Sequence, residues 1–286
     1  MGILGLIRGL RYDLINFFKG DLSLQSSLVY FLLKVKLFKS LITNGMAIKL
    51  PGNMKIMIDS EATLNINIPD HYLRKEYLRH PDYIPRDDWI IIDVGAYVGI
   101  YTIWASKLVG SNGLVIALEP NTLAFRWLLS NIELNRCTNV KALPYALGDK
   151  LTKSTLYIAD VNPEASSLIK SHVIENPVGG YPILCSFTVP VITLDHLIDN
   201  SLNLIGKRID RVNLMKIDVE GYEMKVLEGA RKSLEKGLIS KVVIEVHIDQ
   251  VSTAELVKYL IQFGYTLDKA IRFSNVKDIV YMRLRR

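Results

Sequence analysis

The spacing of hydrophobic residues changes along the chain and predicts a helical start followed by a hairpin. In residues 1–43 apolar side chains recur every three or four positions, as on one face of an amphipathic helix, so we expect two helices. Residues 47–68 change to short β-like runs, and Pro51-Gly52-Asn53 is a turn signal between residues 48–50 and 55–58. We expect a small β-hairpin there, ahead of the main domain.

From residue 89 onward, apolar strands alternate with helical segments. The run Ile90-Ile91-Ile92 is entirely apolar, as expected for a strand whose sheet is covered by helices on both faces. The predicted strands lie at residues 90–92, 114–118, 140–145, 212–217, 242–246, 265–267 and 279–284, and the predicted helices at residues 98–109, 121–135, 222–236 and 253–263. This alternation indicates an α/β fold with a Rossmann-like, largely parallel sheet.

Residues 150–190 interrupt the alternation with clusters of Ser, Pro and Gly, among them Asn162-Pro163. We interpret this segment as an insertion that lies over the active site. The chain is then predicted to consist of an N-terminal extension of helices and a hairpin, residues 1–88, followed by one α/β domain, residues 89–286.

Charge is distributed unevenly along the chain. The formal net charge is +6, and residues 1–41 carry six basic side chains against two acidic ones. The basic, amphipathic N-terminal segment could pack on the protein's own core, on a second copy of the chain, or in the interface of an acidic membrane. The sequence leaves these alternatives open.

Several features argue for a cytoplasmic protein. The longest uncharged stretch near the N-terminus, residues 22–33, is shorter than the roughly 20 apolar residues that cross a bilayer, and no small-residue cleavage site follows the N-terminal apolar residues. Cys137 and Cys185 lie far apart without a His or Cys at metal-ligand spacing, which is typical of reduced thiols. We therefore predict a cytoplasmic protein, peripheral at the membrane if residues 1–43 bind lipid.

The strongest chemical signal is the run from Ile91 to Gly99, in which an apolar strand leads into a glycine turn and then a helix. Glycine permits a positive φ and a close approach to a ligand, and a helix start offers free N–H groups. Ligands of open α/β sheets bind beyond the carboxyl ends of the strands. Asp93 at this strand end would repel a pyrophosphate and attract an amino or sulfonium group. The turn therefore favours a positively charged cofactor.

Glu119 ends the next strand, 26 positions after Asp93. A carboxylate at this place can accept hydrogen bonds from both hydroxyls of a ribose. The same pairing suits NAD, and Glu119 could instead cap the helix that follows. Glu119 alone therefore does not choose between cofactors.

Two more predicted strands end in residues suited to proton transfer. Asp218 and Glu220 follow residues 212–217 and could orient an acceptor hydroxyl, take its proton or bind a divalent cation, or they could merely start a helix. In the strand at residues 242–246, alternation places Glu245 and His247 on one face. His247 is a candidate proton acceptor or, alternatively, a structural hydrogen-bond partner.

A set of motifs, in order from residue 89 to residue 247, resembles the FkbM family of methyltransferases. The motifs are Asp93-Val-Gly-Ala-Tyr-Val-Gly, Glu119-Pro-Asn, Asn131 with Leu134-Asn135, Ala146-Leu147-Gly148, Lys216-Ile-Asp-Val-Glu-Gly, Glu228-Gly-Ala and Glu245-Val-His. Each motif alone is weak, but the ordered set is specific. The resemblance implies a class I methyltransferase sheet with helices on both faces, S-adenosylmethionine as the cofactor, and a hydroxyl group of a small molecule or sugar as the methyl acceptor.

The resemblance also implies roles for individual residues. The turn after Asp93 would surround the methionine part of the cofactor, Glu119 would bind its ribose, and Asp218 would lie near the transferred methyl group. The predicted cofactor-binding residues are Asp93, Gly95, Tyr97, Gly99, Thr102, Glu119, Asn121, Ala146 and Leu147, and the predicted catalytic residues are Asp218, Glu220 and His247. No metal site is predicted, although the need for a divalent cation stays open. Tyr97 departs from the family, which usually has Asn there; because Asn tolerates a left-handed backbone better, a displaced turn and weaker cofactor binding are foreseen.

Together these features predict a methyltransferase that uses S-adenosylmethionine to methylate a hydroxyl of a small molecule, a sugar or a lipid-linked glycan, with Asp218 or His247 as the base. One alternative is an NAD(P)-dependent oxidoreductase, although the turn lacks the G-x-G-x-x-G spacing. Another is a catalytically inactive scaffold at a membrane surface. The expected partners are a small-molecule or glycan acceptor and a second copy of the chain, and no nucleic acid.

Overall fold

The computed structural model describes residues 47–285, except residues 58–59, 61–62, 64–66, 73–74 and 176–179. The two helices predicted in residues 1–43 lie outside the described residues. The predicted hairpin is confirmed, because β1 (Ala47–Leu50) pairs with β2 (Met54–Met57) in antiparallel register across the 3-10 turn η1 (Pro51–Asn53). None of the described helices has the length and apolar character that crossing a membrane requires.

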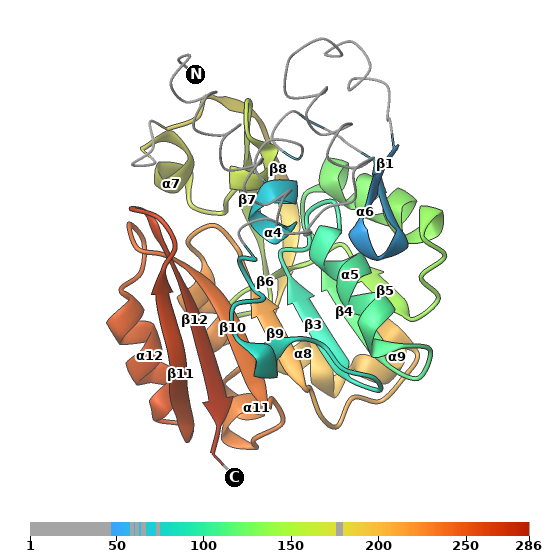
Figure 1. The fold of residues 1–286 in the computed structure, drawn as a ribbon. Coiled ribbons are helices and arrows are strands. Elements are labelled where there is room, and N and C mark those ends of the chain that lie inside the picture. The colour runs from blue at the N-terminus through green and yellow to red at the C-terminus, as the bar shows by residue number, and fades with distance from the viewer. Residues whose placement is uncertain are drawn as a thin grey trace.

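A seven-stranded sheet forms the centre of the molecule (Figure 1). Its strands lie in the order β11 (Tyr265–Arg272), β12 (Lys277–Leu284), β10 (Lys241–His247), β9 (Leu214–Ile217), β3 (Ile90–Val94), β4 (Leu114–Leu118) and β5 (Val140–Leu143). Strands β10, β9, β3, β4 and β5 are parallel, whereas β12 is antiparallel to both of its neighbours. The predicted Rossmann-like α/β fold is confirmed, and the carboxyl ends of the five parallel strands meet at one edge of the sheet.

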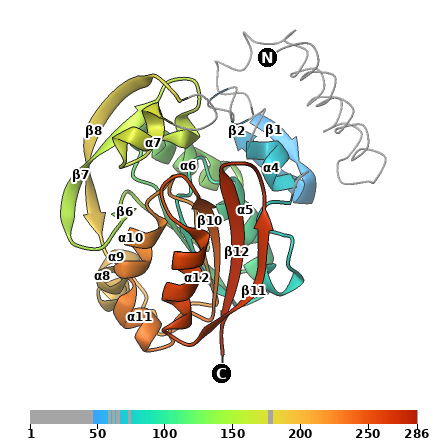
Figure 2. The same cartoon turned by 90° about the vertical axis from the view of Figure 1, so that its left-hand side faces the viewer.

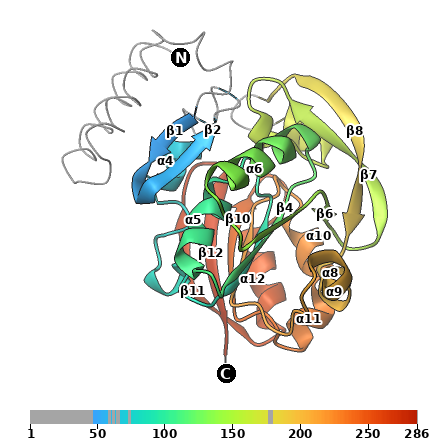
Figure 3. The ribbon, with the colours of Figure 1, turned by 90° about the vertical axis from the view of Figure 1, so that its right-hand side faces the viewer.

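Helices cover both faces of this sheet (Figures 2 and 3). One face carries α5 (Ile100–Val109) and α6 (Thr122–Leu134), and the other carries α8 (Leu194–Asp199), α9 (Ser201–Ile205), α10 (Glu223–Glu228), α11 (Arg231–Glu235) and α12 (Thr253–Ile261). Because strand side chains alternate between the two faces, Ile91 packs in the core under α5 whereas Ile92 packs in the core under the second set of helices. Both layers are apolar, which explains the unbroken hydrophobic run in β3.

The hairpin β1–β2 is packed directly against the first of these layers. Its buried residues, such as Met54 and Ile56, share one hydrophobic cluster with Val98, Ile100 and Ile103 at the start of α5. A helix of five residues, α4 (Ile68–Tyr72), and a 3-10 turn, η3 (Pro81–Tyr83), connect this region to β3. The extension and the α/β domain therefore have a common core where the structure describes them.

Residues 150–190 contain a β-ribbon that the sequence did not predict. β7 (Thr152–Ala159) and β8 (Ile183–Ile192) pair in antiparallel register, and β6 (Ala146–Leu147) joins the end of β8. The 3-10 turn η4 (Pro163–Ala165) and α7 (Lys170–Ile174) lie between the two long strands. The ribbon and α7 are at the side of the molecule where the parallel strands end (Figure 1), so this segment contributes to whatever binds at that edge.

The single helix predicted at residues 222–236 is in fact two short helices, α10 and α11. The break follows Gly229, whose backbone is so close to β6 that a Cβ atom there would lie 1.9 Å from the carbonyl oxygen of Gly148. Helices α8 and α9 were also absent from the prediction. The prediction of one continuous helix was wrong because a tertiary contact, which helical periodicity does not reveal, ends α10.

Candidate active site

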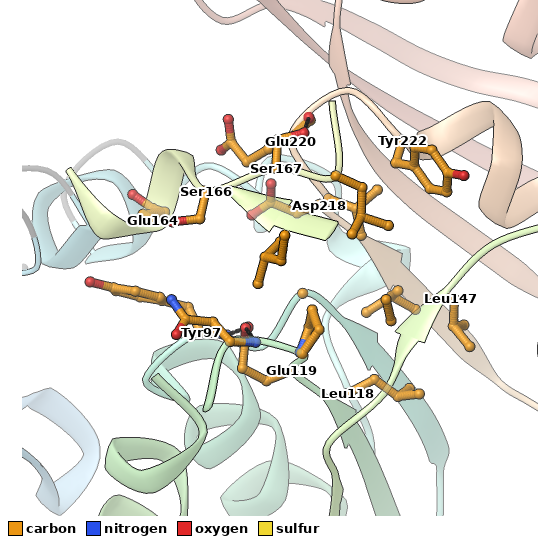
Figure 4. A pocket seen from close by; sticks show the side chains of 18 of the residues that line it. Tyr97, Leu118, Glu119, Leu147, Glu164, Ser166, Ser167, Asp218, Glu220 and Tyr222 are labelled. Carbon is orange, nitrogen blue, oxygen red and sulfur yellow. Dashed lines mark hydrogen bonds between the residues drawn. The ribbon is translucent and has the colours of Figure 1, made fainter. Parts of the chain in front are cut away.

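A pocket of about 660 Å³, including solvent at its mouth, opens at the carboxyl ends of β3, β4 and β9. Figure 4 shows Asp218 and Glu220 on one side of the pocket and Tyr97 and Glu119 on the opposite side. Among the described residues that line it, four are acidic, the fourth being Glu164, and none is Lys or Arg. The pocket is therefore suited to a cationic or uncharged ligand.

The turn after β3 contains three residues with left-handed backbones, of which Gly95 and Tyr97 line the pocket. Gly95 has φ 80°, Tyr97 has φ 50° and Gly99 has φ 91°. The N–H groups of Gly95 and Ala96 both donate to the carbonyl oxygen of Leu118 at 3.0 Å, which ties the turn to β4. On its other side, a Cβ atom on Gly95 would lie 1.8 Å from the carbonyl oxygen of Asp218. Only glycine fits between these two strand ends.

Tyr97 adopts the left-handed backbone that Asn would adopt more easily, and the turn is nevertheless kept. Its N–H donates to Glu119 Oε2 at 2.7 Å, and its hydroxyl lies 3.4 Å from Ser60 Oγ. The ring also packs against the cluster that the hairpin shares with α5. These contacts help to offset the backbone cost, and the weaker cofactor binding foreseen for Tyr97 stays a prediction.

Glu119 is buried at the end of β4 and is held by two backbone N–H groups. Oε2 accepts from Tyr97 and Oε1 accepts from Asn121 at 2.8 Å. Burial raises the pKa of Glu119 to about 7, although these hydrogen bonds oppose the shift. The side chain of Asn121, not Glu119, caps α6 by accepting from Leu123 N at 3.0 Å. Glu119 is thus oriented into the pocket with lone pairs left for further donors.

Asp93 was predicted to attract the cofactor directly, but it does not line the pocket. Its side chain is fully buried, accepts a hydrogen bond from Thr102 Oγ1 at 2.5 Å and lies 3.2 Å from Lys216 Nζ. A buried carboxylate needs such a partner, because an unpaired charge in the interior is costly. Gly99 and Thr102 likewise lie beneath the pocket. These three residues shape the turn without facing the cavity.

Lys216 is a buried residue whose role the sequence did not reveal. Its Nζ donates to the carbonyl oxygen of Gly95 at 2.9 Å and lies 3.4 Å from Asp218 Oδ2. Although burial alone would lower the pKa of Lys216, Asp93 and Asp218 raise it above its usual range. One fixed cation therefore links the glycine turn to the opposite wall of the pocket. The only sequence signal was its place two residues before Asp218, which puts both side chains on one strand face.

Asp218 lines the pocket and is anchored through a single oxygen atom. Oδ2 accepts a hydrogen bond from the hydroxyl of Tyr77 at 2.8 Å and pairs with Lys216, whereas no described residue hydrogen-bonds to Oδ1. The same tyrosine hydroxyl lies 2.9 Å from Glu245 Oε2. Burial and the charge of Glu245 raise the pKa of Asp218 to about 6. Asp218 is thus a fixed carboxylate beside the cavity.

Glu220 and His247 belong to a network of ion pairs beside Asp218. Glu220 Oε2 lies 3.0 Å from His172 Nε2 and 3.3 Å from His247 Nε2. His247 Nδ1 is in turn 2.8 Å from Glu223 Oε1. Burial would lower the pKa of His247, but Glu220 and Glu223 raise it well above its usual value. A charged ring with both nitrogens engaged favours the structural role for His247, and the side chain does not line the pocket.

The structure brings most of the predicted site together. The predicted residues that line the pocket are Gly95, Tyr97, Glu119, Asn121, Ala146, Leu147, Asp218 and Glu220. The predicted residues that do not are Asp93, Gly99, Thr102 and His247. Residues 163–164 and 166–168, in the segment that was expected over the active site, line the pocket. The sequence did not single out Glu164, Ser167 or Tyr77. These residues lie in segments without periodic pattern, so only the fold places them at the site.

Comparison with known proteins gives a consistent result. The sequence model described as "Methyltransferase FkbM domain" matches residues 93–267. "Methyltransferase 1" of Beauveria bassiana is 30% identical over 171 residues, which cover 56% of this chain and 65% of that protein. "Hexuronic acid methyltransferase AglP" of Haloferax volcanii is 26% identical over 161 residues, which cover 56% of this chain and 57% of that protein. The chain thus spans less than two thirds of the length of both relatives.

Among solved structures, the crystal structure of methyltransferase FkbM from Methylobacillus flagellatus KT is similar to this chain with a TM-score of 0.45 and 16% sequence identity. The superposition covers 77% of this chain and 53% of that chain.

Proposed function

The chain belongs to the FkbM family of methyltransferases, whose methyl donor is S-adenosylmethionine, and on this premise we propose that it methylates a hydroxyl oxygen of a sugar or another small polyhydroxyl molecule. The observation that carries the proposal is the acidic pocket at the carboxyl ends of β3, β4 and β9. Its position is where open α/β sheets bind nucleoside ligands.

The side chains of the pocket fit a sulfonium-bearing nucleoside better than a dinucleotide. Glu119 is fixed by two backbone N–H groups and keeps acceptor capacity for the two hydroxyls of a ribose. Apolar residues such as Leu118 and Leu147 offer a surface for an adenine ring. A pyrophosphate would meet four acidic side chains, of which Asp218 and Glu220 belong to one wall, and, among the described lining residues, no Lys or Arg. This arrangement argues against the NAD(P)-dependent alternative.

S-adenosylmethionine, when bound, would supply an electrophilic methyl group to the acceptor. Among the described residues, Asp218 is the best placed to receive the proton that the acceptor hydroxyl loses as its oxygen–carbon bond forms. Lys216 and Tyr77 hold Oδ2 of Asp218, which leaves Oδ1 as the oxygen that would accept the proton. Glu220 and His247 are less suited, because one oxygen of Glu220 faces two histidine rings and both nitrogens of His247 face carboxylates. A positioned base contributes a factor of roughly 10² to 10⁴ to the rate.

The charge of the pocket also bears on the acceptor. The relative AglP is named as a hexuronic acid methyltransferase, which supports a sugar-like acceptor for this chain. However, Asp218 and Glu220 are carboxylates on one wall of the pocket, whereas burial raises the pKa of Glu164 well above its usual value and keeps it protonated. Like charges repel in a partly buried site. We therefore favour an uncharged sugar or polyol over a hexuronate.

Calorimetry with S-adenosylhomocysteine and with NAD tests the cofactor directly. We expect stoichiometric binding of S-adenosylhomocysteine and none of NAD, and exclusive binding of NAD would refute the proposal. Incubating cell extracts with a labelled methyl donor, followed by mass spectrometry of the labelled product, would then identify the acceptor and the methylated atom.

Substitution of the base gives the second test. Asp218→Asn should lower turnover by roughly 10²- to 10⁴-fold, while the affinity for S-adenosylhomocysteine changes far less. The exposed Asp210→Asn is the matched control, with the same charge change outside the pocket. Full turnover in Asp218→Asn would show that Asp218 is not the base.

Membrane contact through residues 1–43 and the formation of a dimer stay predictions. Residues 1–46 lie outside the described part of the chain. Vesicle flotation with and without residues 1–43 addresses the first, and a sedimentation experiment addresses the second.

A further inference from the structure

Two histidines and a glutamate from three separate elements converge beside Asp218. His172 belongs to α7 of the insertion, Glu220 follows β9, and His247 ends β10. The two Nε2 atoms and one carboxylate oxygen of Glu220 lie within 4.8 Å of one another. We propose that His172, Glu220 and His247 form a binding site for a divalent transition-metal ion such as Zn²⁺.

The outer nitrogen of each ring is held by a carboxylate. His172 Nδ1 lies 2.8 Å from Asp249 Oδ2, and His247 Nδ1 lies 2.8 Å from Glu223 Oε1. Metal-binding histidines commonly donate their second N–H to a carboxylate, which fixes the tautomer and turns the other nitrogen toward the ion. Here both rings are fixed so that Nε2 faces the same oxygen of Glu220.

The spacing of the three atoms also suits a metal ion. A tetrahedral ion with bonds of about 2.0 to 2.1 Å separates its ligand atoms by about 3.3 Å. The two Nε2–Oε2 distances are 3.0 and 3.3 Å, and His247 Nε2 is 3.5 Å from Glu245 Oε1. The ligand atoms therefore need little movement to enclose an ion.

The charges around His172, Glu220 and His247 also favour a bound cation. Each ring lies between two carboxylates, so a neutral ring would direct one nitrogen lone pair at a carboxylate. The arrangement therefore requires either a proton on each ring or one cation of charge +2 among the three groups. Asp218 and Glu245 form a second group of candidate ligand atoms with Glu220 and His247, and each is already paired with a lysine side chain. A divalent cation between His172, Glu220 and His247 satisfies the Nε2 atoms of both rings and the Glu220 carboxylate at once.

The donor set indicates the kind of ion. Two imidazole nitrogens and one carboxylate are typical of Zn²⁺ and its transition-metal neighbours, whereas Mg²⁺ prefers oxygen ligands alone. Glu220 and Asp218 both line the pocket, so an ion at this site would have an open position toward it. An ion there would bind the acceptor hydroxyl and lower its pKa. This last role rests on the proposed function, whereas metal binding itself does not.

Calorimetry on the full chain, stripped of metal with a chelator, tests the site with Zn²⁺, Mn²⁺ and Mg²⁺ as separate probes. We expect one equivalent of Zn²⁺ to bind with a Kd below about 1 µM, Mn²⁺ to bind more weakly, and Mg²⁺ to bind hardly at all. His172→Gln should weaken Zn²⁺ binding by at least about 100-fold. Asp249→Asn, which changes the support of His172 but none of the proposed ligands, should weaken it by roughly 10- to 100-fold.

His196→Gln on α8, outside the cluster, is the control and should leave Zn²⁺ affinity unchanged. Circular dichroism and S-adenosylhomocysteine binding are measured on every variant; if His172→Gln fails to fold, Asp249→Asn carries the test. Absence of stoichiometric Zn²⁺ binding, equal binding of Mg²⁺, or Zn²⁺ affinity that survives the folded variants would overturn the metal site and leave an ion-pair network. Loss of metal binding with intact S-adenosylhomocysteine binding would leave the proposed function standing.

Discussion

At the scale of single residues, the site depends on a glycine that separates two strand ends. Gly95 has a left-handed backbone, and a Cβ atom there would lie 1.8 Å from the carbonyl oxygen of Asp218. Gly206, after α9, has nearly the same φ but nothing within 4 Å of an added Cβ. Substitutions at these two glycines therefore separate the cost of a left-handed backbone from the cost of a steric clash.

We expect Gly206→Ala to lower the free energy of unfolding by about 1 to 2 kcal/mol, which is the cost of a left-handed backbone for a residue with a Cβ. Gly95→Ala should cost about 1 to 3 kcal/mol more, because the methyl group must also displace the end of β9. Urea unfolding of both variants measures the difference. Equal losses would mean that the contact between Gly95 and Asp218 yields without strain.

The carboxyl group of Glu119 predicts how cofactor affinity depends on pH. Burial raises the pKa of Glu119 to about 7, so the group is largely protonated at pH 6 and ionised at pH 8. Ribose hydroxyls donate to the ionised form, and binding therefore favours loss of the proton. The Kd for S-adenosylhomocysteine should fall by up to about tenfold from pH 6 to pH 8. Calorimetry at several pH values measures this change, and Glu119→Gln should make the Kd nearly independent of pH. An unchanged pH dependence in that variant would mean that another group titrates.

Residue types at strand ends predicted much of this chemistry but not its partners. The carboxylates at positions 119, 218 and 220 do reach one pocket, because parallel strands end at a common edge. Asp93 also lies at the carboxyl end of a parallel strand, but its side chain is paired with Lys216 and does not reach the pocket. The local sequence does not show whether the cationic partner of a buried carboxylate is a side chain of the protein or a ligand.

At the scale of elements, the two asparagines that stand out in the sequence join the hairpin to α6. Asn131 accepts from Met57 N at 2.7 Å and donates to the carbonyl oxygen of Val98 at 2.9 Å. Asn135, one turn later, both accepts from and donates to the backbone of Lys55. Side chains of α6 and its C-terminal end therefore hydrogen-bond to the backbone of β2. Asn131 also holds the turn after β3 through the carbonyl oxygen of Val98.

Asn131→Ala removes both bonds of this buried side chain. Each unsatisfied backbone group costs roughly 1 to 3 kcal/mol, whereas the gain in helix propensity from Ala is below about 1 kcal/mol. We therefore expect the free energy of unfolding, measured by thermal unfolding, to fall by about 2 to 4 kcal/mol. The exposed Asn203→Ala should change stability by less than about 0.5 kcal/mol. A loss in Asn131→Ala as small as in this control would mean that water replaces the lost partners.

Element prediction succeeded where burial is regular and failed where it is not. The strands β3 and β4 are buried along their whole length, and their apolar runs match the structure. β8 exposes Leu184 and Cys185 to solvent, so neither an alternating nor a continuous apolar pattern marks it. The outer strand β11 continues to Arg272, beyond the predicted end, because its polar residues belong to an edge strand with one open side.

At the scale of the whole molecule, the pocket joins segments that are far apart in the sequence. The turn after β3, the ends of β4 and β9, the short β6 and residues 163–168 of the insertion all line it. The parallel sheet made its edge predictable, and the break in the alternation placed an insertion over it, but no periodic pattern showed which residues of the insertion line the pocket. A ligand in this pocket contacts all of these segments at once and therefore stabilises the native state as a unit.

That coupling makes the cofactor measurable without knowledge of the acceptor. A ligand present at 100 times its Kd, and bound only to the native state, stabilises that state by about 2.7 kcal/mol. For a domain of this size we expect S-adenosylhomocysteine to raise the Tm by roughly 5 to 10 °C, and NAD at the same concentration to leave it unchanged. Gly95→Ala should lose most of the shift, because the methyl group displaces the floor of the pocket, whereas Asp210→Asn should keep it. If NAD raised the Tm as much as S-adenosylhomocysteine, the carboxylates at positions 119 and 218 would not select the ligand by charge, and the central argument for a sulfonium cofactor would be lost.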